Sequence, residues 1–172
     1  GTRDLAGFGI EDEPAAIAAA GALLQYAQET QRTALPHLRA IQMENPHNHL
    51  HLDGVTRRNL ELLHHPEGRD AHTLAGIMDS TITPMGGRLL RRWIAEPIRD
   101  RERLQLRHDT IGVLLETRLY ETLRLLFRGV GDIERILARV ALGSARPRDL
   151  TTLRQTLGVL PDIRASLAQT NR

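Results

Sequence analysis

The sequence contains no cysteine and no lysine, and each absence excludes several classes of chemistry. Without cysteine the chain has no disulfide framework, no thiol nucleophile and no thiolate ligand for a metal ion. All 23 basic residues are arginine, so no lysine is present to bind phosphates in a P-loop or to form a Schiff base. The H-E-x-x-H, G-x-G-x-x-G and G-x-S-x-G motifs are absent as well. We therefore predict no catalytic residue and no cofactor-binding site in this chain.

Aromatic residues and long hydrophobic runs are also scarce. Aromatic side chains make up only 3% of the chain, which leaves few platforms on which single-stranded nucleic acid could stack. The longest apolar run, residues 15–24, is shorter than the roughly 20 residues that span a bilayer. Acidic residues precede this run, whereas a signal peptide begins with basic ones. These features favour a cytoplasmic protein without a membrane partner, and the 41% of hydrophobic residues suffices for a folded core.

The arginines are nearly balanced by 21 acidic residues, and the formal net charge is only +2. In the C-terminal part the two signs are interleaved, as in Arg101-Glu102-Arg103 and Arg148-Asp149, which is typical of a solvated, ion-paired helix surface. The alternative hypothesis is an independent arginine-rich helical module that binds nucleic acid. Its contacts to DNA phosphate would then come from Arg57, Arg58, Arg88, Arg91 and Arg92.

The clearest helix pattern lies between residues 79 and 99, and we expect other helices to pack around it. Thr83 is a suitable N-cap, Pro84 fits the first helical position, and Pro97 ends the pattern. Trp93, the only tryptophan, lies on the apolar face, so this helix should supply the largest single block of buried area. The other apolar residues of this face are Met85, Leu89, Leu90 and Ile94.

Similar start and stop signals predict further helices before and after this one. A helix should begin at Pro14, and its face of small residues supports a third hypothesis, a protein–protein adaptor. Asp53 or Thr56 should cap a helix that extends to Leu63. The last helix should be kinked or restarted at Pro161, because proline lacks the backbone N–H. Other helices are expected after Asp100, over 119–127, after Asp132 and from Pro147.

A short β element is expected near residues 38–53, where apolar residues alternate on both sides of Asn45 and Pro46. The same stretch should separate two domains, residues 1–45 and 46–172. Three histidines, His47, His49 and His51, also alternate there, and such spacing can hold Zn²⁺. We favour the simpler interpretation that they lie on the solvent side of a strand, and we predict no metal site.

Several ordered motifs resemble the bacterial DNA mismatch-repair protein family MutS. Residues 1–5, 24–27 and 30–32 resemble the end of its connector domain. The segments D-S-T-I-T-P-M-G at 79–86, G-D-I-E-R-I-L-A-R at 131–139 and A-R-P-R-D-L at 145–150 resemble its core domain. The opening of that core domain is matched by residues 52–53 and 56–62, and Trp93 continues it.

The resemblance implies a mainly α-helical fold, a helical-bundle core with a connector remnant, and a role in mismatch repair. Members of the family form dimers around mismatched double-stranded DNA, use ATP and Mg²⁺, and signal to a MutL-type partner near the bacterial nucleoid. Neither their Phe-x-Glu mismatch-reading motif nor their nucleotide-binding loop occurs here. The resemblance therefore implies a non-enzymatic fragment that couples the ATPase end to the DNA clamp. Its structural residues would include Pro84, Trp93, Asp132 and Pro147.

Overall fold

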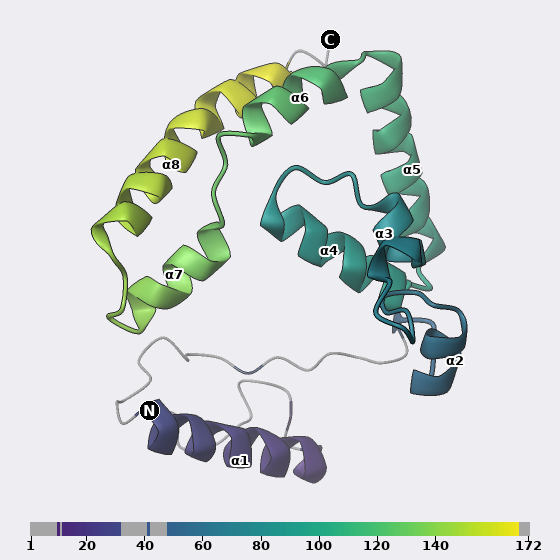
Figure 1. Ribbon diagram of the computed structural model, residues 1–172, viewed down its shortest axis with the longest axis vertical. Coiled ribbons are helices and arrows are strands. Elements are labelled where there is room, and N and C mark those ends of the chain that lie inside the picture. Colours follow the sequence, from purple (N-terminus) through teal and green to yellow (C-terminus); the bar gives the residue numbers. More distant parts are fainter. Residues whose placement is uncertain (1–9, 11, 32–40, 42–47, 169–172) are drawn as a thin grey trace. The chain divides into compact units, whose positions relative to one another are not determined.

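The computed structural model describes residues 10, 12–31, 41 and 48–168, and the chain divides into two compact units, Gly1–Asn45 and Pro46–Arg172. The described residues confirm a mainly helical fold, with eight α-helices and one 3-10 helix (Figure 1). No helix among them is long and apolar enough to cross a membrane. The elements are α1 (Pro14–Gln31), α2 (Gly54–Asn59), η3 (Asp70–His72), α3 (Leu74–Met78), α4 (Pro84–Ala95), α5 (Arg101–Glu116), α6 (Leu119–Phe127), α7 (Ile133–Ala141) and α8 (Pro147–Ala168).

The first unit contributes one described helix, α1, which begins at the predicted Pro14. Ile17, Ala20 and Ala27 form its less exposed side. Leu23 and Tyr26 are 68% and 66% exposed on the remaining surface. These three residues belong to the small-residue face expected from the sequence, whereas Gly21 and Leu24 of that face are exposed.

In the second unit, capping side chains set the helix starts as the sequence predicts. The Thr83 hydroxyl accepts a hydrogen bond from the Gly86 N–H at 3.1 Å, and Pro84 is the first residue of α4. Asp53 and Asp100 cap α2 and α5 in the same way. Each cap satisfies an N–H that has no partner within its own helix, which fixes where the helix begins.

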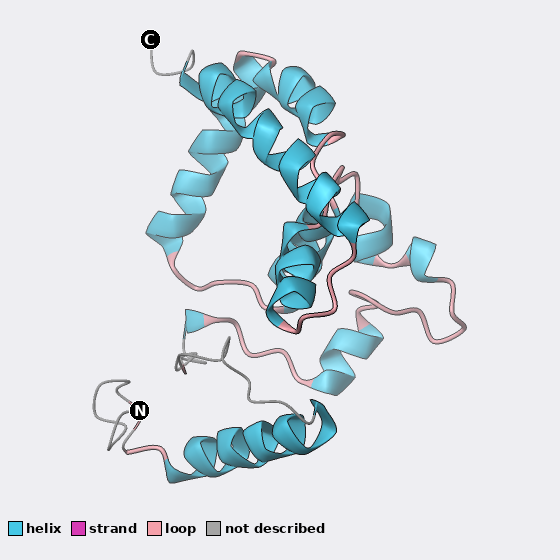
Figure 2. Ribbon diagram, turned by 90° about the vertical axis from the view of Figure 1, so that its left-hand side faces the viewer, coloured by secondary structure: helices cyan, strands magenta, loops and turns pink. Residues whose placement is uncertain are grey.

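The second unit packs as successive helix pairs. Helix α3 contacts η3 and α4, while α6 contacts α5 and α8, and α7 also contacts α8. Figure 2 shows these helices joined by loops, with no strand among the described residues. Its buried hydrophobic side chains are few and mostly small or medium in size, namely Leu62, Ala75, Ala95, Leu123 and Ile136.

Trp93 of α4 is only partly buried. The residue is 40% exposed. The residue packed on its ring is an arginine: the Arg107 guanidinium carbon lies 3.8 Å from the ring centroid. A cation can stack on an indole while staying partly hydrated, and an apolar neighbour would have covered the ring more fully.

One expected helix boundary is wrong. Helix α2 ends at Asn59 and does not reach Leu63, because Glu61 turns the chain with a φ of 47°. Of the two alternatives expected at Pro161, a kink or a restart, the restart does not occur, because α8 continues through Pro161. Pro161 and Leu157 both lie on the exposed side of α8, where water can bind the Leu157 carbonyl that loses its N–H partner.

The β element expected near residues 38–53 falls partly on residues outside the described range, 38–40 and 42–47. Within the described part, His49 forms a single antiparallel bridge with Ile98. The Leu50 N–H donates to the Pro97 carbonyl at 2.7 Å, and the Arg99 N–H donates to the Asn48 carbonyl at 2.9 Å. The partner of this segment is thus the chain that follows α4.

Candidate functional site

One arginine of α4, Arg88, joins this helix to α7 by hydrogen bonds to two carboxylates. Asp132 caps α7 by accepting a hydrogen bond from the Arg135 N–H at 3.2 Å. Both of its oxygens also accept from Arg88 of α4, at 2.8 and 2.7 Å, in the parallel geometry typical of arginine–carboxylate pairs. The Glu134 carboxylate accepts from the same guanidinium at 2.6 and 3.1 Å. One side chain thus fixes the start of α7 and its attachment to α4.

The charges at this junction strengthen one another. The Arg88 guanidinium lowers the pKa of Asp132 from its ordinary 3.8 to about 2, and the Arg135 N–H adds to this shift. Hydrogen bonds to Asp132 and Glu134 raise the pKa of Arg88. The Asp132 side chain is only 16% exposed, whereas Arg88 is 39% exposed. The pair is therefore partly shielded from water on the carboxylate side, and it is fully ionised at neutral pH.

A second junction of the same design joins α7 to α8. Asp149, in the first turn of α8, accepts a hydrogen bond from the Arg146 N–H at 2.9 Å, as the third residue of a capping box does. Its oxygens also accept from the Arg139 guanidinium of α7 at 2.8 and 3.0 Å. The Arg146 N–H and then the Arg139 guanidinium lower the pKa of Asp149, which is buried. Again one carboxylate serves both a helix start and an interhelical contact.

The segment that precedes α7 lies directly against α8. The Gly131 N–H donates to the buried Thr156 hydroxyl at 2.8 Å, and this hydroxyl donates to the Thr152 carbonyl at 2.9 Å. A Cβ atom at Gly131 would lie 2.4 Å from the Thr152 methyl group, so only glycine fits without a shift. We call the set of Arg88, Gly131, Asp132, Arg139 and Asp149 the interhelical junction. It links α4, α7 and α8 in series (Figure 1).

The five arginines proposed as DNA contacts are not gathered at one place. Arg88 is held in the interhelical junction, and Arg92 pairs with Glu96 at 3.4 Å. On α2, the Arg57 Nε donates to the Leu52 carbonyl at 2.9 Å, and Arg58 is exposed. Hydrogen bonds from the His65 N–H to Asp70 and from Thr81 to Asp79 are the main causes that lower the pKa values of these carboxyls, and the positive charge of Arg91 adds to both shifts. Contact of these residues with DNA phosphate stays a prediction.

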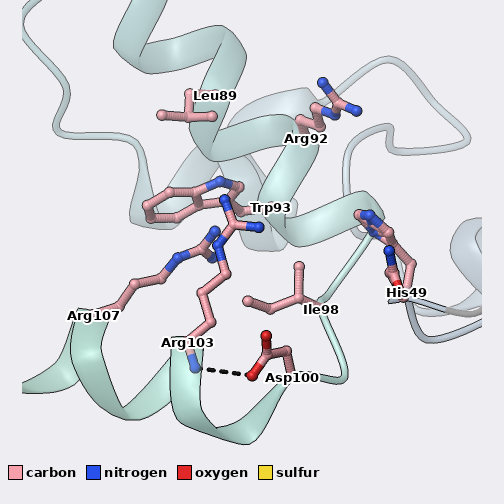
Figure 3. A pocket seen from close by; sticks show the side chains of 9 residues that line it. His49, Leu89, Arg92, Trp93, Ile98, Asp100, Arg103 and Arg107 are labelled. Carbon is pink, nitrogen blue, oxygen red and sulfur yellow. Dashed lines mark hydrogen bonds between the residues drawn. The ribbon is translucent and has the colours of Figure 1, made fainter. Parts of the chain in front are cut away.

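A pocket of about 350 Å³ lies beside Trp93, between α4 and α5 (Figure 3). Arg103 and Arg107 enter it from α5, and Asp100 and His49 also line it. The sequence does not predict this pocket, because its walls come from three separate segments. The signal that was available is the spacing of Arg103 and Arg107, which are four residues apart and so share a helix face.

The histidine series does not form a metal centre within the described residues, where no group of three or more potential ligands comes together. His49 Nδ1 lies 3.3 Å from the Glu96 carbonyl oxygen. A carbonyl can only accept, so this nitrogen is the protonated one. His47 lies outside the described residues.

The sequence of the chain matches two domains of a known protein family. The sequence of MutS domain III matches residues 55–172, and that of MutS domain II matches residues 1–39. The chain belongs to the MutS family. Every residue of the interhelical junction lies inside the domain III match, as do the segments 79–86, 131–139 and 145–150 on which the resemblance rests. Family membership connects this MutS chain with DNA mismatch repair.

Proposed function

We propose that this MutS chain transmits movement between the nucleotide-binding end and the DNA-clamping end of a mismatch-repair protein. The observation that carries the proposal is the double role of Asp132 and Asp149. Each satisfies N–H groups at the start of its own helix and also binds an arginine of another helix. A helix cannot then reorient at a junction without breaking the bond between its oriented carboxylate and the arginine of the neighbouring helix.

The junction geometry suits transmission better than isolated surface ion pairs would. An exposed salt bridge contributes roughly 0–1 kcal/mol and constrains little. Here the carboxylates are largely shielded, the arginines bind with two nitrogens each, and Gly131 brings the backbone against α8. Helices joined in this way move as packed bodies, and a displacement at one end reaches the other without being absorbed between them.

In this proposal the chemistry belongs to other parts of the protein. ATP and Mg²⁺ would bind outside this chain, and the chain itself would be neither an ATPase nor a reader of mismatches. Mismatched double-stranded DNA, a second MutS subunit and a MutL-type protein would be partners of the whole assembly in the bacterial cytoplasm, near the nucleoid. The chain contributes the mechanical link among these activities.

The proposal is tested by Asp132→Asn in a MutS protein that contains this chain together with the ATPase domain. Asparagine is as good an N-cap as aspartate, so α7 should still form, but the charge that holds Arg88 is lost. We expect basal ATP hydrolysis to persist while its stimulation by a mismatched duplex falls. The control is Arg164→Gln, at an exposed position of α8. Unchanged stimulation in Asp132→Asn would contradict the proposal.

The rival hypothesis, an arginine-rich module that binds nucleic acid, requires a separate test. Fluorescence anisotropy of labelled matched and G·T-mismatched duplexes would be measured with the 172-residue chain at two salt concentrations. We expect weak binding that is equal for both duplexes. Strong binding that falls steeply with salt would support the rival, because phosphate contacts release counterions. A preference for the mismatch would assign recognition to this chain.

A further inference from the structure

Two positive charges line the pocket between α4 and α5, and no carboxylate of the described residues forms an ion pair with either guanidinium. Arg103 and Arg107 lie four residues apart on α5 and both line the pocket, and Figure 3 shows both side chains extending from α5 toward Trp93. Among the described residues neither guanidinium forms an ion pair, whereas Arg92 at the same pocket is bonded to Glu96. Like charges at this helix spacing repel one another. An anion between them would remove that repulsion.

The remaining walls of the pocket are suited to a small organic molecule. Leu89, Trp93 and Ile98 provide an apolar surface, and the Arg107 guanidinium carbon is 3.8 Å from the centre of the Trp93 ring. The volume of about 350 Å³ exceeds what a single inorganic ion needs and lies at the lower end of the range for small-molecule sites. Asp100 also lines the pocket, where its carboxylate accepts a hydrogen bond from the Arg103 N–H at 3.0 Å. A carboxylate at this place can accept a hydrogen bond from a hydroxyl group.

We propose that this pocket binds a small phosphate monoester, with its phosphate held by Arg103 and Arg107 and its hydroxyl-bearing part lying between Trp93 and Asp100. A phosphate has three acceptor oxygens and can engage two guanidinium groups at once, whereas a carboxylate has two oxygens and pairs best with one. The site lies outside the interhelical junction and does not depend on the proposed transmission of movement.

Trp93 is the only tryptophan of the chain, so its fluorescence reports directly on this pocket. The 172-residue chain would be titrated with glycerol phosphate, inorganic phosphate, acetate and sodium chloride at constant ionic strength. We expect a saturable change in emission with glycerol phosphate, a weaker one with inorganic phosphate, and none with acetate or chloride. Arg103→Gln should weaken the binding of glycerol phosphate by about tenfold or more, because it removes a charged hydrogen-bond donor.

Two controls keep the experiment decisive. Arg101→Gln removes the same charge from α5 at an exposed position outside the pocket and should leave binding unchanged. Circular dichroism should show equal helix content in both variants. A response equal to that of chloride, or equal in Arg103→Gln and the unmodified chain, would mean an adventitious ion only and would overturn the proposal. If acetate changes the Trp93 emission as much as glycerol phosphate does, the proposal is overturned in favour of a carboxylate ligand. If inorganic phosphate changes the emission and glycerol phosphate does not, a phosphate monoester is excluded as the ligand.

Discussion

The interhelical junction and helix α5 both contain arginines, yet these arginines have opposite surroundings. In the junction, Arg88 and Arg139 are each bound by a carboxylate that also serves a helix start. On α5, Arg103 and Arg107 face a pocket, and none of the residues of α5 is buried. Several apolar residues of α5 are exposed, among them Leu106 at 66% and Leu115 at 59%, whereas Leu104 and Leu114 are partly buried.

This difference shows that the position of the acids decides what an arginine does. A carboxylate placed at a helix start is already oriented by backbone N–H groups, so an arginine from a neighbouring helix meets a fixed partner. An arginine on a helix face without such a partner keeps its charge available for a ligand. The net charge of the whole chain cannot distinguish the two cases. The following predictions test whether the two regions differ as described.

The largest effect is expected for Asp132→Ala, which removes both the cap of α7 and the bond to Arg88. Loss of the cap should cost about 1 kcal/mol, and loss of a partly exposed charged pair about as much again, so the free energy of unfolding should fall by about 2 kcal/mol. The free energy of unfolding is measured by urea titration, with circular dichroism as the signal. Asp132→Asn should lose only the second part, and equal losses in the two variants would show that the cap contributes nothing.

Replacement of two different glycines by alanine should change the stability of the fold in opposite directions. Gly131→Ala places a methyl group against Thr152, whose β-branched side chain has little freedom in a helix, and should destabilise the fold by about 1–2 kcal/mol. Gly112→Ala on α5 meets no atom within 4 Å and should stabilise it by about 0.5–1 kcal/mol. Thermal unfolding of both variants provides the measurement. Destabilisation by Gly112→Ala would mean that α5 is packed more closely than described.

Acid should weaken the junction in a defined pH range. The pKa of Asp132 is lowered in the folded state, from 3.8 to about 2, so its contribution to stability is complete above pH 4 and is lost as the pH falls toward 2. After allowance for solvent screening the loss should be about 1 kcal/mol. The free energy of unfolding would be measured along this range. Asp132→Asn should show a smaller decrease, and an identical decrease would exclude this group as its source.

The smallest effect on stability is expected for Arg103→Gln. Removal of one of two like charges on α5 should change the free energy of unfolding by only a few tenths of a kcal/mol, in the stabilising direction. Arg88→Gln, the matched change in the junction, should destabilise the fold clearly because two carboxylates lose their common partner. Parallel urea titrations compare the two. Similar losses would show that the two regions do not differ in the way proposed.

Much of the helical organisation could be predicted because the signals are local. Four helix starts are marked by residues within a few positions, and the structure places the helices there. These residues are Thr83 with Pro84, Asp100, Asp132 and Pro147. The motifs at 79–86, 131–139 and 145–150 likewise indicated the family before any contact was known. Local chemistry is sufficient for such features, since a cap and its helix are neighbours in sequence.

The partners of these side chains could not be predicted, because they are distant in sequence. Arg88 and Asp132 are separated by 44 positions, and nothing in either local pattern identifies the other. Trp93 was expected to be buried because its helix is amphipathic, but its neighbour is Arg107 of α5. Pro161 was expected to kink or restart α8, and the helix continues there at an exposed position without restarting. The partner of a side chain depends on which helix surfaces pack together. Helix periodicity alone does not determine this packing.

The most direct test of the central claim is a distance measurement across the interhelical junction. The chain has no cysteine, so Leu89→Cys on α4 and Gln155→Cys on α8, both at exposed positions, can carry two spin labels without a background. Double electron–electron resonance then gives the distribution of label distances. If the junction transmits movement, the distribution should be narrow and should broaden when Asp132→Asn is added, while Arg164→Gln leaves it unchanged. A distribution that is equally broad with and without Asp132→Asn would contradict the claim.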